Sequence, residues 1–257
     1  MVAWGLFVWG ELVGTDHEMG WAWTGLCGFC ETWTVATKIP ALIFDLDGTL
    51  TDSKPGIVGC LRKVLDARRI AHPGALDRFV GPPVEEWAVE LLPNGSEEDR
   101  IALADDYRGC YDREGWKNNS VFPAVRAVLA ELQSEGFPLY VCTSKQLRFA
   151  VRILDHFGLT PWFKAVYGDK AEYASHSKID LLGRLIAEQG LDRHSAWMIG
   201  DRIFDIDVAH GNGVRCLFAG WGYGPAVEGE QADAVAETAG DIRAIVATVG
   251  GSRNQGA

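Results

Sequence analysis

The chain has 257 residues, of which 47% are hydrophobic, and this is enough for one large domain or for a core with an insertion. Its 24 Lys and Arg residues against 35 Asp and Glu residues give a formal charge of -11, which argues against a nucleic-acid polymer or an anionic membrane as the main partner. The six Cys are scattered and form no dense framework, so we expect reduced thiols in a soluble, cytoplasmic protein.

Residues 1–38 differ in composition from the rest of the chain. They hold five of the ten Trp and many Gly, with no Lys or Arg before Lys38. The opening apolar run ends at Glu11, which is too short for a membrane span and lacks the positive start of a secretory signal. Cys27 and Cys30 form a single CxxC pair, a weak metal or redox signal. We expect a poorly ordered extension or a start site placed too far upstream, with a Trp-rich interaction arm as the alternative.

The next segment predicts one short strand followed by helices. The apolar residues 41–44 indicate a buried strand that ends at Asp45. Apolar spacing then predicts helices over 55–70, 84–92 and 96–116, and a break at Gly81, Pro82 and Pro83. Residues 56–120 therefore form a predicted all-helical insertion, which is well placed to act as a lid over the end of that strand.

From residue 123 onward, helices and strands alternate. This alternation predicts a doubly wound, parallel α/β sheet with right-handed crossovers, whose strand ends share one edge. The predicted core comprises residues 39–55 and 121–249, and residues 250–257 form a frayed tail. We predict helices over 123–135, 146–157, 178–189, 204–210 and 241–249, and strands over 139–143, 165–167, 196–199 and 215–219.

Two carboxylates mark the end of the first core strand. Asp45 and Asp47 lie two residues apart and are followed by Gly48, which lets the chain turn sharply. Open α/β sheets bind ligands at the carboxyl ends of their strands. Two carboxylates this close repel each other unless a cation lies between them or one takes up a proton. The alternative is a capped turn in which these residues only shape the loop.

Thr143, Ser144 and Lys145 follow the second core strand. A hydroxyl group and the backbone N–H groups at such a position can hold phosphoryl oxygens, and an ordinary helix cap is the alternative. Asp201 and Asp205 stand four residues apart across a later strand-to-helix turn. As a solitary pair they would be helix-start acids, since Asp is favoured there.

Joined to Asp45 and Asp47, however, Asp201 and Asp205 form a set of hard oxygen ligands that suits Mg²⁺. Lys178 begins a predicted helix, where its positive charge is unfavourable because it opposes the helix dipole. A lysine at this position therefore requires another explanation. Neutralising a carboxylate and phosphoryl oxygens is such an explanation. Lys170 in the preceding loop is the rival for this role, and Lys145 is a further candidate to contact a substrate anion.

These patterns resemble the four motifs of the haloacid-dehalogenase-like (HAD) hydrolase superfamily, in family order, over about residues 39–249. The first is the run from Asp45 to Leu50, the second Thr143, the third Lys178 and the fourth Gly200-Asp-x-x-x-Asp205. The resemblance implies a Rossmann-like core with an inserted helical cap. The runs 51–53 and 56–120 resemble the phosphoglycolate phosphatase-like branch. More narrowly, the runs 79–83, 143–145, 198–205 and 221–224 resemble its bacterial 5'-nucleotidase-like members.

The resemblance also implies a role for each matched residue. Asp45 is the expected nucleophile and Asp47 the expected general acid/base, while Thr143 and Lys178 stabilise the phosphoryl oxygens. The expected Mg²⁺ ligands are the Asp45 side chain, the Asp47 backbone carbonyl, Asp201 and Asp205. The candidate substrate-binding residues are Thr143, Ser144, Lys145, Gly81 and Pro82.

The expected activity is Mg²⁺-dependent hydrolysis of a small phosphorylated metabolite. Nucleoside 5'-monophosphate, 2-phosphoglycolate and a sugar phosphate all remain candidate substrates. Gly81 and Pro82 contact the leaving group or merely break the helix, and Arg62 and Lys63 form a solvated face in the favoured interpretation. The alternatives are a sugar phosphomutase of the same superfamily and a non-catalytic binding protein on this fold.

Overall fold

The computed structural model describes residues 39–72, 74–82, 84–169 and 177–250, with the side chains of residues 249 and 250 excepted. These residues belong to one compact unit, Thr37–Ala257. The predicted extension over residues 1–38, the CxxC pair, Lys170 and residues 251–257 of the predicted tail lie outside the described residues.

A six-stranded parallel sheet forms the core, in the order β5-β4-β1-β6-β7-β8. The predicted doubly wound α/β fold is therefore confirmed. Phe44 at the end of β1 pairs with Val141 on one side and Ile199 on the other. This register brings the residues that follow these strands to one edge of the sheet. The strands are β1 (Leu42–Phe44), β4 (Leu139–Gln146), β5 (Ala165–Asp169), β6 (Trp197–Gly200), β7 (Arg215–Ala219) and β8 (Ala234–Ala236).

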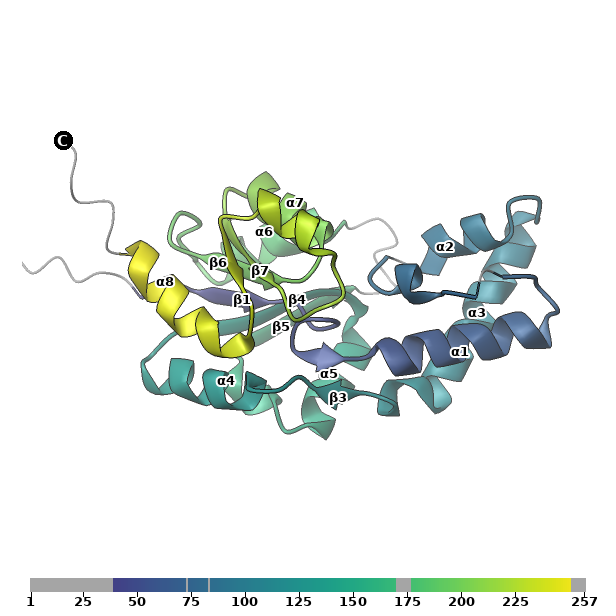
Figure 1. Ribbon diagram of the computed structural model, residues 1–257, viewed down its shortest axis with the longest axis horizontal. Coiled ribbons are helices and arrows are strands. Elements are labelled where there is room, and N and C mark those ends of the chain that lie inside the picture. Colours follow the sequence, from purple (N-terminus) through teal and green to yellow (C-terminus); the bar gives the residue numbers. More distant parts are fainter. Residues whose placement is uncertain (1–38, 73, 83, 170–176, 251–257) are drawn as a thin grey trace, which may run out of the picture. The chain divides into compact units, whose positions relative to one another are not determined.

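Helices cover both faces of this sheet (Figure 1). Side chains alternate along β1, so Leu42 and Phe44 join one apolar cluster and Ile43 joins the other. The first cluster contains residues of α4, α5 and α8, and the second contains residues of α6 and α7. These helices are α4 (Val125–Ser134), α5 (Leu147–His156), α6 (Lys178–Glu188), α7 (Ile203–Gly211) and α8 (Ile242–Gly250).

Among the described residues, three α-helices lie in the predicted insertion and form a cap beside the core (Figure 1). They are α1 (Lys54–Ala67), α2 (Val84–Leu91) and α3 (Glu97–Arg113), with α1 and α2 both packed on α3. Ser96 and Asp99 form a reciprocal cap at the start of α3. The predicted helix over 96–116 ends earlier, at Arg113, and a 3₁₀ turn follows over Gly115–Lys117.

Three short strands, β2 (Thr51–Asp52), β3 (Ser120–Val121) and β8, were not predicted. Strand β2 pairs antiparallel with β3 where the chain enters and leaves the cap, and β8 adds an edge to the core sheet. The predicted strand over 139–143 was too short, because β4 continues to Gln146 through a register shift after Thr143. Thr143, Ser144 and Lys145 thus belong to the irregular end of a strand and do not form a turn before α5.

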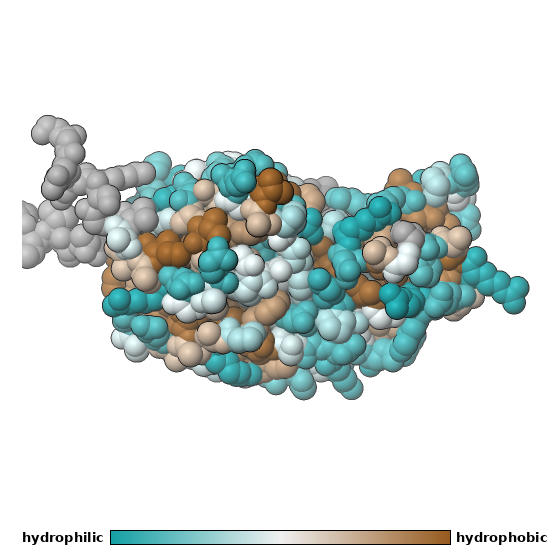
Figure 2. All heavy atoms as spheres, viewed as in Figure 1, coloured by the Kyte–Doolittle hydropathy of each residue, from teal (hydrophilic) through white to brown (hydrophobic). Residues whose placement is uncertain are grey.

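Polar and apolar residues are interspersed on the face in Figure 2, and hydrophilic side chains cover much of its cap. Among the described residues, no helix combines the length and the apolar character that crossing a membrane requires.

The loop after β7 ties the core to the start of the cap. Trp221 Nε1 donates a hydrogen bond to the Thr49 carbonyl oxygen at 2.9 Å. The Tyr223 hydroxyl donates to Asp52 Oδ1 at 2.9 Å and accepts from the backbone N–H of Lys54 at 3.0 Å. Tyr223 therefore holds β2 and the first turn of α1 together.

We predict that Tyr223→Phe lowers the free energy of unfolding by about 2 kcal/mol, because it removes one hydrogen bond to a carboxylate and leaves a helix-start N–H unpaired. Urea unfolding followed by circular dichroism would measure this loss. Tyr140→Phe is the matched control, since the Tyr140 hydroxyl has no hydrogen bond within the described part of the chain, and should change stability by less than about 0.5 kcal/mol. Equal effects of the two variants would contradict this role.

Candidate active site

The chain turns sharply after β1, and Gly48 makes this turn possible. Gly48 has a φ of 90°, and its N–H donates to the Thr51 carbonyl oxygen at 2.9 Å. A Cβ atom at this position would lie only 2.3 Å from Asp201 Oδ2. Gly222 is equally constrained, because a Cβ atom there would lie 2.2 Å from the Asp201 Cβ atom. Both glycines let the backbone approach the Asp201 side chain.

Three carboxylates meet at the sheet edge. Asp45 follows β1, Asp201 follows β6 and Asp205 lies in the first turn of α7. All three are buried, and one oxygen atom from each lies within 4.8 Å of the others. Burial, with repulsion from neighbouring carboxylates, raises the pKa of Asp45 to about 7 and that of Asp201 to about 8. The structure thus brings together three of the four carboxylates that the sequence analysis joined into one ligand set.

Lys178 lies against this group of carboxylates. Its Nζ atom is 2.6 Å from Asp45 Oδ1 and 2.5 Å from Asp205 Oδ1. Burial alone would lower the pKa of Lys178, but the two carboxylates outweigh it and hold the pKa above its usual range. Lys178 begins α6, and Ser177 caps that helix by accepting a hydrogen bond from the Asp180 N–H. The structure thus gives the electrostatic reason for a Lys at this helix start.

The Asp47 side chain turns away from the three carboxylates toward β4. Its Oδ2 atom lies 2.7 Å from Lys145 Nζ, and both side chains are largely buried. Its Oδ1 atom is buried without a hydrogen-bond partner among the described residues. Lys145 also lies over the ring of Tyr111 from α3, at 4.8 Å from its centroid. Asp47 therefore has one carboxylate oxygen fixed and one left for a ligand.

The remaining predicted residues line one cavity between core and cap. Thr143 is buried, and its hydroxyl accepts a hydrogen bond from the Lys145 N–H at 3.2 Å. Ser144 is exposed at the cavity, and Gly81 and Pro82 line it from the cap side. Arg62 and Lys63 are exposed and are not among the described residues that line this cavity, which agrees with a solvated face.

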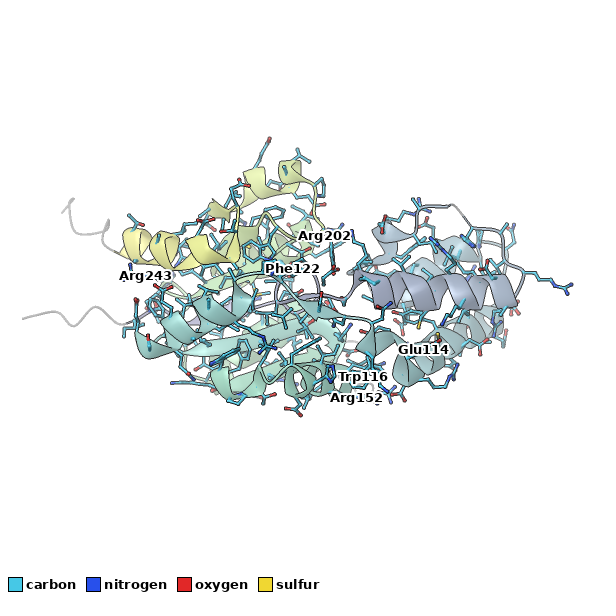
Figure 3. All side chains as sticks on the ribbon, turned by 60° about the horizontal axis from the view of Figure 1, so that its bottom comes forward. Glu114, Trp116, Phe122, Arg152, Arg202 and Arg243 are labelled. Atoms are coloured by element: carbon cyan, nitrogen blue, oxygen red, sulfur yellow. The ribbon has the colours of Figure 1, made fainter. Side chains whose placement is uncertain are left out.

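Sequence reasoning missed an arginine that links core and cap. Arg202, in the fourth motif, donates from Nη1 to the Val80 carbonyl oxygen at 3.0 Å and from Nε to Glu228 Oε2 at 3.3 Å (Figure 3). It also missed a support of Asp201, because the Tyr223 N–H donates to Asp201 Oδ2 at 2.7 Å. The Gly-x-Gly spacing at 222–224 was the available signal for a close backbone approach.

An aromatic wall was also missed. The cap contributes most of it, and Tyr107 packs edge-on against Trp87 with ring centroids 5.0 Å apart. Arg108 lies beside this wall, in ion pairs with Glu85 and Asp105. Apolar spacing alone could not separate these residues from ordinary helix core. The aromatic residues that line the cavity are Phe79, Trp87, Tyr107, Tyr111, Phe149 and Phe204.

The donor set fits a hard divalent cation. Asp45, Asp201 and Asp205 provide buried carboxylate oxygens that all lie within 4.8 Å of one another, and burial raises the pKa of Asp45 and of Asp201. The Asp47 carboxylate is not part of this group, because it is paired with Lys145. Among the predicted metal ligands, Asp47 would therefore contribute its backbone carbonyl only.

Comparison with known proteins agrees with this geometry. The tyrosine-protein kinase PtkA of Mycobacterium tuberculosis is 37% identical over 187 residues, which cover 72% of this chain and 63% of that protein. The chain thus spans less than two thirds of that relative's length. A 5'-nucleotidase of Pseudomonas aeruginosa is 36% identical over 74% of this chain and 86% of its own. A phosphoglycolate phosphatase of Caulobacter vibrioides is 33% identical over 71% of this chain and 79% of its own.

Solved structures show the same fold. The crystal structure of a predicted phosphatase from Clostridium acetobutylicum matches with a TM-score of 0.73 and 30% identity, over 82% of this chain and 98% of that one. The sequence pattern of haloacid dehalogenase-like hydrolases matches residues 42–219, which carry all four motifs. The resemblance found in the sequence is confirmed, and the chain belongs to the haloacid dehalogenase-like hydrolase family.

Proposed function

We propose that this protein is a Mg²⁺-dependent phosphatase that hydrolyses nucleoside 5'-monophosphates through an aspartyl-phosphate. The observation that carries this proposal is the pairing of Asp45 with Lys178 and of Asp47 with Lys145 at one end of an aromatic cavity. Two neighbouring carboxylates held by separate cations are suited to separate tasks, one as nucleophile and one as acid and base.

Asp45 attacks the phosphorus atom in line, and a bond forms between a carboxylate oxygen and phosphorus. The bond from phosphorus to the ester oxygen breaks, and Asp47 acts as the general acid that gives a proton to the departing alkoxide. Asp47 then takes a proton from a water molecule, which attacks the phosphorus and releases Asp45 and inorganic phosphate. The free Oδ1 atom of Asp47 is available for both proton transfers.

The other residues stabilise charge. Lys178 neutralises the Asp45 carboxylate, so that a phosphate dianion can approach it. Thr143 and Ser144 line the cavity beside these groups and are placed to donate hydrogen bonds to phosphoryl oxygens. Mg²⁺ held by Asp45, Asp201, Asp205 and the Asp47 carbonyl would supply further charge neutralisation.

The cavity favours a leaving group with a neutral ring over a small carboxylate. A nucleobase can stack on aromatic side chains such as Tyr107 and Trp87. 2-Phosphoglycolate needs a free cation for its carboxylate, whereas the four cations that the described lining contributes are already paired. Lys145 pairs with Asp47 and Lys178 with Asp45. Arg108 pairs with Glu85, and Arg202 pairs with Glu228.

A second candidate function is transfer of a phosphoryl group to tyrosine, which the name of the mycobacterial relative supports at 37% identity. In that case a tyrosine hydroxyl takes the place of the attacking water. The 5'-nucleotidase relative shares more of its own length with this chain, and its name supports the hydrolase.

We predict that the full chain with Mg²⁺ releases phosphate from nucleoside 5'-monophosphates faster than from 2-phosphoglycolate or sugar phosphates. A colorimetric phosphate assay across this panel would measure it, with Asp45→Asn as the blank. Asp45→Asn should abolish turnover, because the nucleophile is lost. Asp205→Asn should mainly raise the Mg²⁺ concentration needed for half-maximal rate, and mild, equal effects of both variants would contradict the assigned roles.

The same preparations distinguish the alternatives. Phosphotyrosine formed from ATP, with no phosphate released from the panel, would favour the kinase. Phosphate transfer that requires a sugar bisphosphate primer would favour the mutase. If no activity of any kind exceeds the blank, the alternative of a non-catalytic binding protein on this fold would be favoured.

We predict that the apparent affinity for Mg²⁺ falls by at least about tenfold between pH 8 and pH 6, because protons compete for the carboxylates of Asp45 and Asp201. Their folded-state pKa values lie above the unfolded value of 3.8, so the ion-free folded protein holds more protons than the unfolded chain between about pH 4 and 8. The stability of the ion-free protein therefore decreases as pH rises through that window. The gain in stability from Mg²⁺ binding should be largest at pH 8. Calorimetric titration at pH 6, 7 and 8 would test this.

The exposed Asp207 on α7 offers a matched control for the titration. Asp207→Asn removes one surface carboxylate from the helix that carries Asp205 and should leave the Mg²⁺ affinity and its pH dependence unchanged. Affinity that is flat from pH 6 to 8 in the unsubstituted chain would contradict the proposed ligands.

We predict that Tyr107→Leu raises KM for nucleoside monophosphates about tenfold or more, since stacking of a base on an aromatic ring is worth about 1–3 kcal/mol. The KM for glycerol phosphate, which has no ring, should change less than about twofold. Tyr107→Phe keeps the ring and should behave like the unsubstituted chain. An equal rise in KM for both substrates would show that the substitution only destabilises the cap and that the Tyr107 ring does not stack on a nucleobase.

A further inference from the structure

A pair of cysteines lies in the cap, outside the active site. Cys60 on α1 and Cys110 on α3 are both free and almost fully buried, with their Sγ atoms 2.7 Å apart. Bond formation needs the sulfurs to approach by only about 0.7 Å, because a disulfide is about 2.05 Å long. Two thiolates on one tetrahedral zinc ion stand about 3.8 Å apart, given Zn–S bonds of about 2.3 Å. The geometry therefore favours a covalent bond over a shared metal, although Glu114 completes a possible ligand group.

Two charged residues lie next to Cys110. Glu114 Oε1 lies 3.4 Å from Cys110 Sγ, where it can accept the thiol proton, and Lys63 Nζ lies 2.7 Å from the same oxygen (Figure 3 labels Glu114 on the cap). Burial raises the pKa of both thiols, that of Cys60 to about 12, and at Cys110 Glu114 adds to the rise while Lys63 opposes it. The order of the two steps therefore rests on the proton acceptor beside Cys110 and on access to the two sulfurs.

Access to the two sulfurs also differs. A surface cavity reaches Cys110 and is lined by Lys63, Val64, Gly109, Arg113 and Glu114. Cys60 does not line that cavity, and it packs against Gly115, where a Cβ atom would lie 2.7 Å from its Sγ atom. An oxidant of small size therefore meets Cys110 before Cys60.

We propose that Cys60 and Cys110 are a redox modification site that forms a reversible disulfide on exposure to a hydroperoxide. Cys110 gives its proton to Glu114, and its thiolate attacks one peroxide oxygen. The O–O bond breaks, a sulfenic acid forms on Cys110, and the departing hydroxide takes the proton from Glu114 to become water. The Cys60 sulfur then attacks the Cys110 sulfur, the S–O bond breaks, and the hydroxyl group leaves with the Cys60 proton as a second water molecule. In total, two thiols and one hydrogen peroxide give one disulfide and two water molecules.

The bond would join residues 50 positions apart in sequence and lock α1 to α3. The next residue on α3 is Tyr111, which lines the active-site cavity beneath Lys145. The cross-link would thus fix the helix that forms part of the cavity wall. The proposal does not depend on which phosphate ester the protein hydrolyses.

The test is peptide mapping of the full chain after treatment with hydrogen peroxide, alkylation under denaturing conditions and digestion without reductant. We expect one peptide pair that joins Cys60 to Cys110 with the loss of two hydrogen atoms, and its disappearance with dithiothreitol. Mapping is needed because Cys27 and Cys30 would confuse a total thiol count. Recovery of Cys60 and Cys110 both fully alkylated after peroxide would overturn the proposal.

Variants separate the two steps. Cys60→Ser should leave a sulfenic acid on Cys110 that dimedone traps, whereas Cys110→Ser should give no adduct at Cys60. Glu114→Gln should slow the cross-link about tenfold, in keeping with the loss of the base. Cys142→Ser, at a buried thiol elsewhere, is the matched control and should form the cross-link at the normal rate.

Two further measurements bear on the same pair. The oxidised chain should melt roughly 5–15 °C above the reduced chain, a difference that Cys110→Ser removes. One equivalent of zinc in the purified protein, lost in Cys110→Ser, would overturn the proposal in favour of a metal site.

Discussion

Repulsion among buried carboxylates is the constraint on which this structure depends. Asp45, Asp201 and Asp205 share one edge of the sheet within 4.8 Å of one another, and burial deprives them of the water that would screen their charges. Lys178 offsets part of this charge, and the proposed Mg²⁺ would offset the rest. Gly48 exists at its position because a side chain there would collide with Asp201. The site therefore dictates both the charges around it and the shape of the backbone beside it.

The sequence predicted this edge well because each of its residues follows a local pattern. Asp45 and Asp201 both come directly after short apolar runs, and a parallel sheet necessarily brings such positions together. Lys178 was placed by an electrostatic argument, that a positive charge at a helix start needs a partner, and its partners are Asp45 and Asp205. Chemistry that lies within a few residues of a strand end can be read from one sequence.

The parts that were missed depend on residues distant in the chain. Tyr223 supports Asp201 and Asp52 from a loop whose sequence shows only a pair of glycines, and β2, β3 and β8 are too short to show any periodicity. The extension of β4 to Gln146 comes from its pairing with Asp169 on β5. Tertiary pairing overrides local preference at such places, so no argument from neighbouring residues could have found them.

In the proposed mechanism, the core and the cap have different tasks. The carboxylates and lysines at the sheet edge would activate a phosphoryl group in the same way whatever it is attached to, so they would not select the substrate. Substrate selection would then depend on the walls of the cavity. There Tyr107 and Trp87 provide aromatic rings, and the charge of Arg108 is paired with Glu85. Relatives that are 33%, 36% and 37% identical to this chain accordingly carry names for different activities. A change of specificity in this chain therefore requires changes in α2 and α3, with the sheet edge left intact.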